Sequence, residues 1–146
     1  MYYTTTSDFS NFTKAKLLYD QGFNVIDATI QKKDRTFYMF LKDETRHPAQ
    51  KNLKVVTSST LTGGYSKPLG TITGDYWAEG PTVTRKDDKW LMYFDKYTLH
   101  KYGAITSADL VNWTDVSDQV SLPKGIRHGT VFTVSKTELE KLQAVK

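Results

Sequence analysis

The chain has 146 residues, of which 38% are apolar and 13% aromatic, a size that suits one domain with a moderate core. Lys and Arg outnumber Asp and Glu by 20 to 16, and the interspersed signs give a formal net charge of +4 without a basic patch, which excludes nucleic acid as an expected partner. The sequence lacks cysteine and any apolar run of membrane-spanning length, which excludes disulfides, thiolate metal sites and a membrane partner from our expectations.

The expected elements are mostly strands, because aromatic and β-branched residues are plentiful. The opening "MYYTTTSDF" reads as a strand already in progress, so residues 1–19 are expected to be the outer strands of an incomplete unit. A full unit is expected at 25–72, with strands at 25–31, 36–41 and 53–58 and an outer edge at 65–72.

A second unit is expected at 77–120, with strands at 79–84, 89–94, 102–106 and 114–120. A third unit begins at 126–134 with a single strand. Ser135 lies three residues before Glu138, which is a capping-box pattern. This pattern predicts a short helix over 136–143 that covers an edge of the fold.

These units are repeats of one another. Aligning "VIDATI", "WAEGPTV" and "IRHGTV" places Asp27, Glu79 and His128 in one column, 52 and 49 residues apart. A period of about fifty residues with four short strands per unit is typical of a β-propeller blade. The Trp-Asp marks of WD40 repeats are absent from the sequence, and the paired glycines of kelch repeats occur once. The sequence therefore predicts an all-β propeller of about 2.5 to 3 blades with a short C-terminal helix.

The repeated turns "TSDFSNFT" and "TSADLVNWT" are interpreted as structural. Asp, Ser and Asn form local hydrogen bonds in turns, and the aromatic residue that follows is large enough to fill a gap between sheets. We expect them to insert Phe12 and Trp113 between blades.

The column of ionisable residues predicts a site, since equivalent positions of successive blades converge on the propeller axis. Two carboxyl groups and an imidazole suit glycoside hydrolysis, which needs a proton donor whose pKa is raised. Glu79 follows Trp77 and precedes a Gly-Pro step, and Asp27 would supply the negative charge that raises its pKa. His128, beside Arg127, would bind water, an ion or substrate hydroxyls.

Each of these residues alone has a simpler interpretation, as a solvated acid, a turn acid or a structural histidine. Their shared register is what favours a functional site. Asp43 and Asp95 also share a column at the ends of second strands. They could line the same opening, although a structural role is favoured for them.

The motifs "VIDATI", "YWAEGPTV" and "RHGTV", with the recurring "TSxDLxxW"-like turns, resemble glycoside hydrolase family 43 over nearly the whole chain. That family consists of five-bladed β-propellers that act on arabinose- and xylose-containing polysaccharides and oligosaccharides with inversion. The resemblance implies that Glu79 is the general acid and Asp27 its pKa modulator, with Trp77, Arg127 and His128 contacting substrate. It further implies an exported protein with no required cofactor, in which His128 lies near calcium, another cation or water at the axis.

The chain departs from that family at the general base, an Asp on the innermost strand of the first blade. No residue of this chain takes that position, so we expect an incomplete site, inactive alone, which N-terminal blades or another chain would complete. A non-catalytic carbohydrate-binding or structural propeller segment is the main alternative. A protein-interaction propeller of kelch type is the third.

Overall fold

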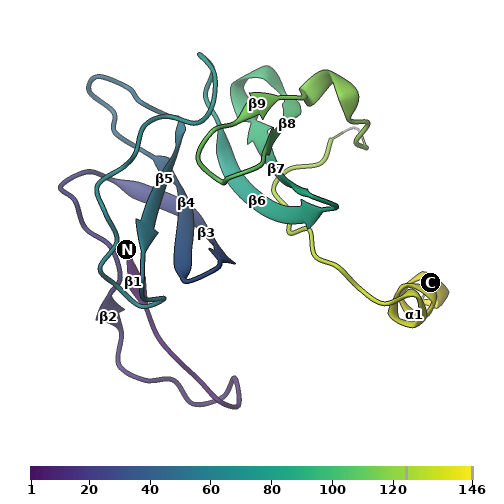
Figure 1. Ribbon diagram of the computed structural model, residues 1–146, viewed down its shortest axis with the longest axis horizontal. Helices are drawn as coiled ribbons and strands as arrows, with labels where there is room; N and C mark the ends of the chain where they lie inside the picture. Colours follow the sequence, from purple (N-terminus) through teal and green to yellow (C-terminus); the bar gives the residue numbers. More distant parts are fainter. Residues whose placement is uncertain (124, 146) are drawn as a thin grey trace.

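The computed structural model describes residues 1–123 and 125–145, which form three antiparallel β-sheets side by side and a separate helix (Figure 1). The first sheet pairs β1 (Tyr2–Tyr3) with β2 (Lys16–Leu17). The second has the order β3 (Val25–Lys33), β4 (Thr36–Asp43), β5 (Leu53–Ser58). The third has the order β6 (Glu79–Lys86), β7 (Lys89–Lys96), β8 (Lys101–Ser107), β9 (Thr114–Asp115). This arrangement confirms the prediction of a partial β-propeller.

The second and third sheets repeat the same hairpin in the same register. The β3–β4 hairpin closes with Lys33 opposite Thr36, and the β6–β7 hairpin closes with Lys86 opposite Lys89. Counting from these turns makes Phe40 equivalent to Tyr93, Met39 to Met92, and Lys42 to Asp95. Because side chains alternate along a strand, the two members of each equivalent pair point to the same side of their own sheets.

Two apolar clusters join the three sheets. We call the side of a sheet that faces the next sheet along the chain its following face, and the opposite side its preceding face. The following face of the second sheet carries Phe40, Leu53 and Val55, which pack with Met92 and Ile105 of the third sheet. The preceding face of the second sheet packs against the first sheet through Met39, Leu41, Val56, Tyr19 and Tyr65. The second sheet therefore lies between the other two and contributes apolar side chains to both contacts.

The turn before β9 shows how a blade inserts an aromatic ring into its neighbour. Ser107 Oγ accepts the N–H of Leu110, and Asp109 Oδ1 accepts the N–H groups of Val111 and Asn112. The turn holds Trp113 against Phe40 of the second sheet, with ring centroids 5.6 Å apart at 88°. The prediction that Trp113 packs between blades is confirmed.

The corresponding prediction for Phe12 is wrong. Thr6 and Asp8 make the same turn with the same kinds of hydrogen bond, yet Phe12 is exposed. In the described residues, the first sheet has no sheet on its preceding side that could receive this ring.

Three of the expected outer elements differ from the structure. The edge at 65–72 contributes one bridge, between Lys54 and Thr71, because Pro68 has no N–H and Gly70 has a φ of 141°. The strand expected at 114–120 shortens to β9 and the 3₁₀ turn Ser117–Gln119. Segment 126–134 forms no strand; its contact with β6 includes the Val131 N–H, 3.0 Å from Thr82 Oγ1.

The C-terminal helix α1 (Lys136–Ala144) forms close to where it was predicted, with the capping box between Ser135 and Glu138. The prediction that it covers an edge is wrong, because all its described side chains are exposed and it projects from the sheets (Figure 1). Among the described residues, no helix is long and apolar enough to span a membrane.

Candidate functional site

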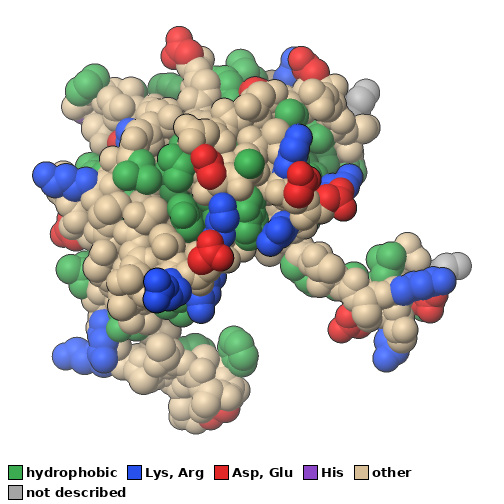
Figure 2. Space-filling model, viewed as in Figure 1, with side chains coloured by type: hydrophobic (Ala, Val, Ile, Leu, Met, Phe, Trp, Pro, Cys, Tyr) green, Lys and Arg blue, Asp and Glu red, His purple; other side chains and the backbone are tan. Residues whose placement is uncertain are grey.

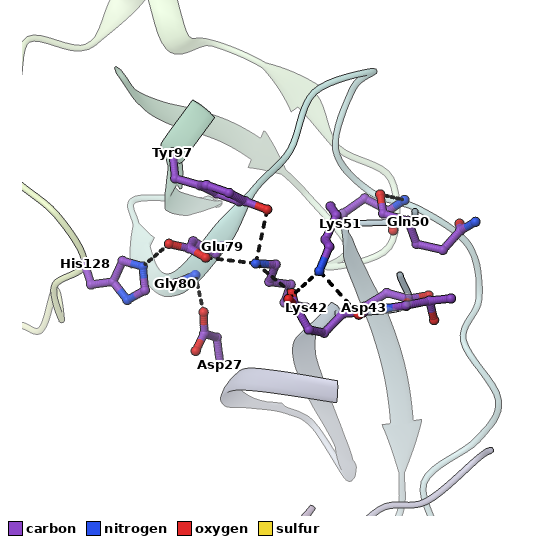
Figure 3. Close-up of polar contacts among 12 residues, drawn as sticks. Asp27, Lys42, Asp43, Gln50, Lys51, Glu79, Gly80, Tyr97 and His128 are labelled. Atoms are coloured by element: carbon purple, nitrogen blue, oxygen red, sulfur yellow. Dashed lines mark hydrogen bonds and ion pairs between the residues drawn. The ribbon is translucent and has the colours of Figure 1, made fainter. Parts of the chain in front are cut away.

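Asp27, Glu79 and His128 come together where β3, β6 and segment 126–134 meet (Figure 3). Their side-chain ligand atoms lie within 4.8 Å of one another, which confirms the predicted convergence. Glu79 Oε1 is 3.0 Å from His128 Nε2, and Asp27 Oδ2 accepts the N–H of Gly80 at 3.1 Å.

β-Bulges place these residues. In β3, Asp27 and Ala28 oppose one residue of β4, and in β6, Gly80 and Pro81 oppose one residue of β7. Asp27, Gly80 and His128 have φ values of 53°, 58° and 37°, a left-handed conformation that is uncommon for residues other than glycine. This shared conformation shows that Gly80 is the true equivalent of Asp27 and His128.

The predicted column was therefore wrong by one residue in the second unit. Glu79 is equivalent to Ile26 and Arg127, which directly precede the left-handed residue. It reaches the site because its longer side chain bends toward His128 from the neighbouring position.

Glu79 is held by cations on both carboxylate oxygens. Lys42 Nζ lies 2.8 Å from Oε2, while Arg127 Nη2 lies 3.2 Å from Oε1. Burial tends to raise the pKa of Glu79, but the hydrogen bonds and charges of Lys42 and His128 outweigh it and hold the pKa below 4.5. The expectation of a raised pKa is not met, and Glu79 is ionised near neutral pH.

Two ion pairs of opposite polarity connect successive units. Lys42 of β4 pairs with Glu79 of the next unit, and Asp95 of β7 pairs with Arg127 of the unit after that. Because Lys42 and Asp95 are equivalent, one position of the repeat supplies both contacts. Asp43, which shared a column with Asp95 in the sequence, lies elsewhere, 3.7 Å from Lys54.

Aromatic and basic side chains adjoin Glu79. The exposed ring of Trp77 lies 5.9 Å from the ring of Tyr97, in the 3₁₀ turn Tyr97–Leu99. Lys42 Nζ is 3.4 Å from the Tyr97 hydroxyl, and Lys51 lies over Trp77 while pairing with Glu44. The exposed indole thus offers an apolar face next to Tyr97 and Lys51, and Tyr97 contacts the lysine that pairs with Glu79.

Lys42 and Tyr97 are site residues that sequence reasoning missed. Lys42 is almost fully buried and also lies 2.9 Å from Glu44 Oε2. Counting from the two hairpins would have shown that Lys42 and Asp95 are equivalent. That was the available signal for Lys42. Tyr97 belongs to the 3₁₀ turn Tyr97–Leu99, which has no counterpart in the longer connection between β4 and β5.

A pocket of about 350 Å³ lies between the bulges, lined by Asp27, Ala28, Gly80, Pro81, His128, Gly129 and Thr130. The three ligand atoms are close enough to surround a cation. The donor set nevertheless fits a divalent ion poorly, because Lys42 and Arg127 already neutralise Glu79 and would repel it. A water molecule or a sugar hydroxyl fits these groups better.

Replacing Gly80 by alanine is expected to displace His128 and weaken its contact with Glu79. An added Cβ would lie 2.9 Å from the imidazole carbons, and the left-handed backbone costs about 1–2 kcal/mol for a residue other than glycine. Thermal unfolding and the His128 ring ¹⁵N shifts would measure both effects. Gly129→Ala is the control, because its Cβ would meet nothing within 4 Å; equal effects from both substitutions would contradict the prediction.

The bladed sheets, with acids and a histidine at their axial end, define a β-propeller of the glycosidase type. The chain belongs to the glycosyl hydrolase 43-related family, whose model, described as a probable glycosyl hydrolase domain, matches residues 1–140. Among curated proteins, none matches the sequence.

Solved structures share the fold. A glycosyl hydrolase from Bacteroides ovatus has a TM-score of 0.58 and 18% identity, over 79% of this chain and 39% of its own. A thermostable family-43 glycoside hydrolase has a TM-score of 0.55 and 17% identity, over 80% and 49%. A family-43 β-xylosidase/α-arabinofuranosidase from a compost microbial metagenome has a TM-score of 0.55 and 14% identity, over 66% and 35%. The chain thus spans less than half the length of these proteins.

Proposed function

We propose that this chain supplies the proton-donor half of a glycosidase site that hydrolyses arabinose- or xylose-containing glycans with inversion. The observation that carries the proposal is the convergence of Asp27, Glu79 and His128 within 4.8 Å. The exposed ring of Trp77 lies against Tyr97, whose hydroxyl contacts the Lys42 that pairs with Glu79. The compost xylosidase, which has the same fold, was solved with xylotriose, which supports a pentose oligosaccharide as the ligand.

The proposed roles follow from the contacts. Trp77 would stack on a sugar ring, and Arg127 and His128 would donate hydrogen bonds to its hydroxyls. Glu79 would protonate the departing glycosidic oxygen. Asp27 accepts the Gly80 N–H and thereby fixes the backbone next to Glu79. We propose that Asp27 positions Glu79 in this way, in addition to its proposed effect on the pKa of Glu79.

Asp27 is too close to Glu79 to act as the general base. An inverting enzyme separates its two carboxyl groups by about 6.5–9.5 Å to admit a water molecule. The ligand atoms of Asp27 and Glu79 lie within 4.8 Å. Since the neighbouring Asp95 and Glu44 are paired with Arg127 and Lys51, we propose that the base comes from outside this chain.

Azide tests whether this chain supplies the proton donor and lacks the base, because the azide anion attacks without needing a base. Azide would attack the anomeric carbon of xylotriose as the C–O bond breaks, and Glu79 would give its proton to the leaving oxygen. We expect glycosyl azide of inverted configuration from wild-type protein at mildly acidic pH, and about 10²–10⁴-fold less from Glu79→Gln. Glu140→Gln, on the exposed helix α1, is the control.

Lys42 favours a second function, non-catalytic carbohydrate binding. Its contact with Glu79 Oε2 keeps that carboxylate ionised, and an ionised carboxylate accepts hydrogen bonds from sugar hydroxyls but donates no proton. Xylotriose binding that survives Glu79→Gln, with no azide product from either protein, would establish this function and overturn the proton-donor role.

A further inference from the structure

The turn at residues 6–12 and the turn at residues 107–113 are the same structure in two different environments. In both, a hydroxyl oxygen accepts the N–H three residues later, and an Asp carboxylate accepts two backbone N–H groups and an Asn side-chain amide. Phe9 and Leu110, at the same position, have φ values of 56° and 71°. The two turns therefore present their apolar side chains in the same way.

The burial of these apolar side chains differs completely. Leu110 is 0% exposed, and Trp113 packs on Phe40 at the following face of the second sheet. Their counterparts Phe9 and Phe12 are 87% and 57% exposed. Figure 2 shows apolar side chains on the loop that carries them, which projects away from the sheets. This loop is a docking element without a receptor in the described chain.

The chain also carries a receptor without an occupant, on the following face of the third sheet. Tyr93 is the equivalent of Phe40, and its partner Ala104 is the equivalent of Val55. A groove of about 680 Å³ lies over this face, lined by Leu91, Tyr93, Thr106, Val116 and Val120 with charged residues at the hairpin end. The face has the same strand positions as the one that receives Trp113.

We infer that the 6–12 turn of one copy docks into the Tyr93 groove of a second copy, as Leu110 and Trp113 dock on Phe40 within one copy. The contact is head to tail, because the two surfaces that meet are different. Such contacts close into rings or extend as open assemblies, according to the rotation between copies. This inference concerns self-association and is independent of the proposed chemistry at Glu79.

Two variants of the full chain test the inference by sedimentation velocity. Phe9→Ser/Phe12→Ser removes the docking turn, and Tyr93→Lys blocks the groove. We expect the wild-type protein to associate with rising concentration, and each variant alone to associate about tenfold or more weakly. An equimolar mixture of the two variants is expected to form a heterodimer and nothing larger, because each variant retains the surface that the other has lost.

A crosslink identifies the contact. The chain has no cysteine, so mixing Phe12→Cys with Tyr93→Cys should give a disulfide-linked dimer under mild oxidation. Leu139→Ser/Leu142→Ser, which removes two exposed apolar residues from α1, is the matched control and is expected to associate like the wild type. Circular dichroism and thermal unfolding would show that each variant is folded.

Three outcomes would overturn the inference. The wild-type protein would remain monomeric at all concentrations, the mixture of variants would fail to form a heterodimer, or association would depend on Leu139 and Leu142 instead of Phe9 and Phe12. The last outcome would show that α1, and not the turn, is the contact between copies.

Discussion

Replacing Phe40 by alanine is expected to lower the free energy of unfolding by about 3–5 kcal/mol. Phe40 is fully buried in the middle strand of the second sheet, and it contacts Trp113 of the third. The substitution would remove apolar burial, leave a cavity between the sheets and end the edge-to-face contact of the two rings. Urea denaturation followed by circular dichroism and by tryptophan fluorescence would measure the loss.

The control is Phe132→Ala, at an exposed phenylalanine of segment 126–134. It is expected to change the free energy of unfolding by less than about 0.5 kcal/mol. A loss below 1 kcal/mol for Phe40→Ala, or separate transitions for the two probes already in the wild type, would show that the second and third sheets are not one cooperative unit.

The strands of the two full blades could be predicted because they rest on local patterns. The charged hairpin turns at 32–35 and 85–88 precede aromatic strands, and the structure places β4 and β7 at those strands, each extended by two residues beyond the prediction. The period of about fifty residues then indicated the propeller. Outer strands were less predictable, because the edge at 65–72, which contains Pro68, pairs with β5 through one isolated bridge.

The exact register of the site could not be predicted. A bulge adds an unpaired residue to a strand without a distinctive sequence, so matching "DATI" to "EGPTV" left the choice between Glu79 and Gly80 open to error. The left-handed φ of Asp27, Gly80 and His128 resolves it. The convergence was still predicted correctly, since a glutamate side chain spans the difference of one position.

The charge state of Glu79 could not be predicted either, because it depends on a residue 37 positions earlier in the sequence. Local sequence showed Trp77 and a Gly-Pro step, which suggested an apolar setting. The fold instead brings the buried Lys42 from the preceding blade to within 2.8 Å. An ion pair between blades thus decides the protonation of the candidate acid.

Replacing Lys42 by methionine is expected to raise the pKa of Glu79. The substitution keeps most of the buried apolar stem and removes the charge that most opposes the effect of burial on Glu79. Glu79 would retain Arg127 and His128, and Glu44 would retain Lys51, so the expected loss of stability near neutral pH is about 1–3 kcal/mol. A ¹³C titration of the Glu79 carboxyl would measure the pKa directly.

The effect of pH on stability follows from the direction of the shift. In the wild type, the pKa of Glu79 is lower in the folded state than its ordinary value of 4.5, so its ionisation stabilises the fold above that pH. This stabilisation is lost as the pH falls through the folded pKa. In Lys42→Met the pKa of Glu79 in the folded state rises toward or beyond 4.5. The stabilisation that ionised Glu79 provides above pH 4.5 therefore becomes smaller. The difference in free energy of unfolding between the variant and the wild type is expected to decrease at acidic pH.

Lys54→Met is the matched control, since Lys54 is a partly buried lysine of the same sheet but pairs with Asp43 and not with Glu79. It is expected to leave the pKa of Glu79 unchanged. If both variants gave the wild-type pKa, the charge of Lys42 would have no influence on Glu79, and Arg127 and His128 would be sufficient to hold the carboxylate ionised. If Lys42→Met alone raises the pKa, the lysine of one blade keeps the candidate proton donor of the next blade ionised.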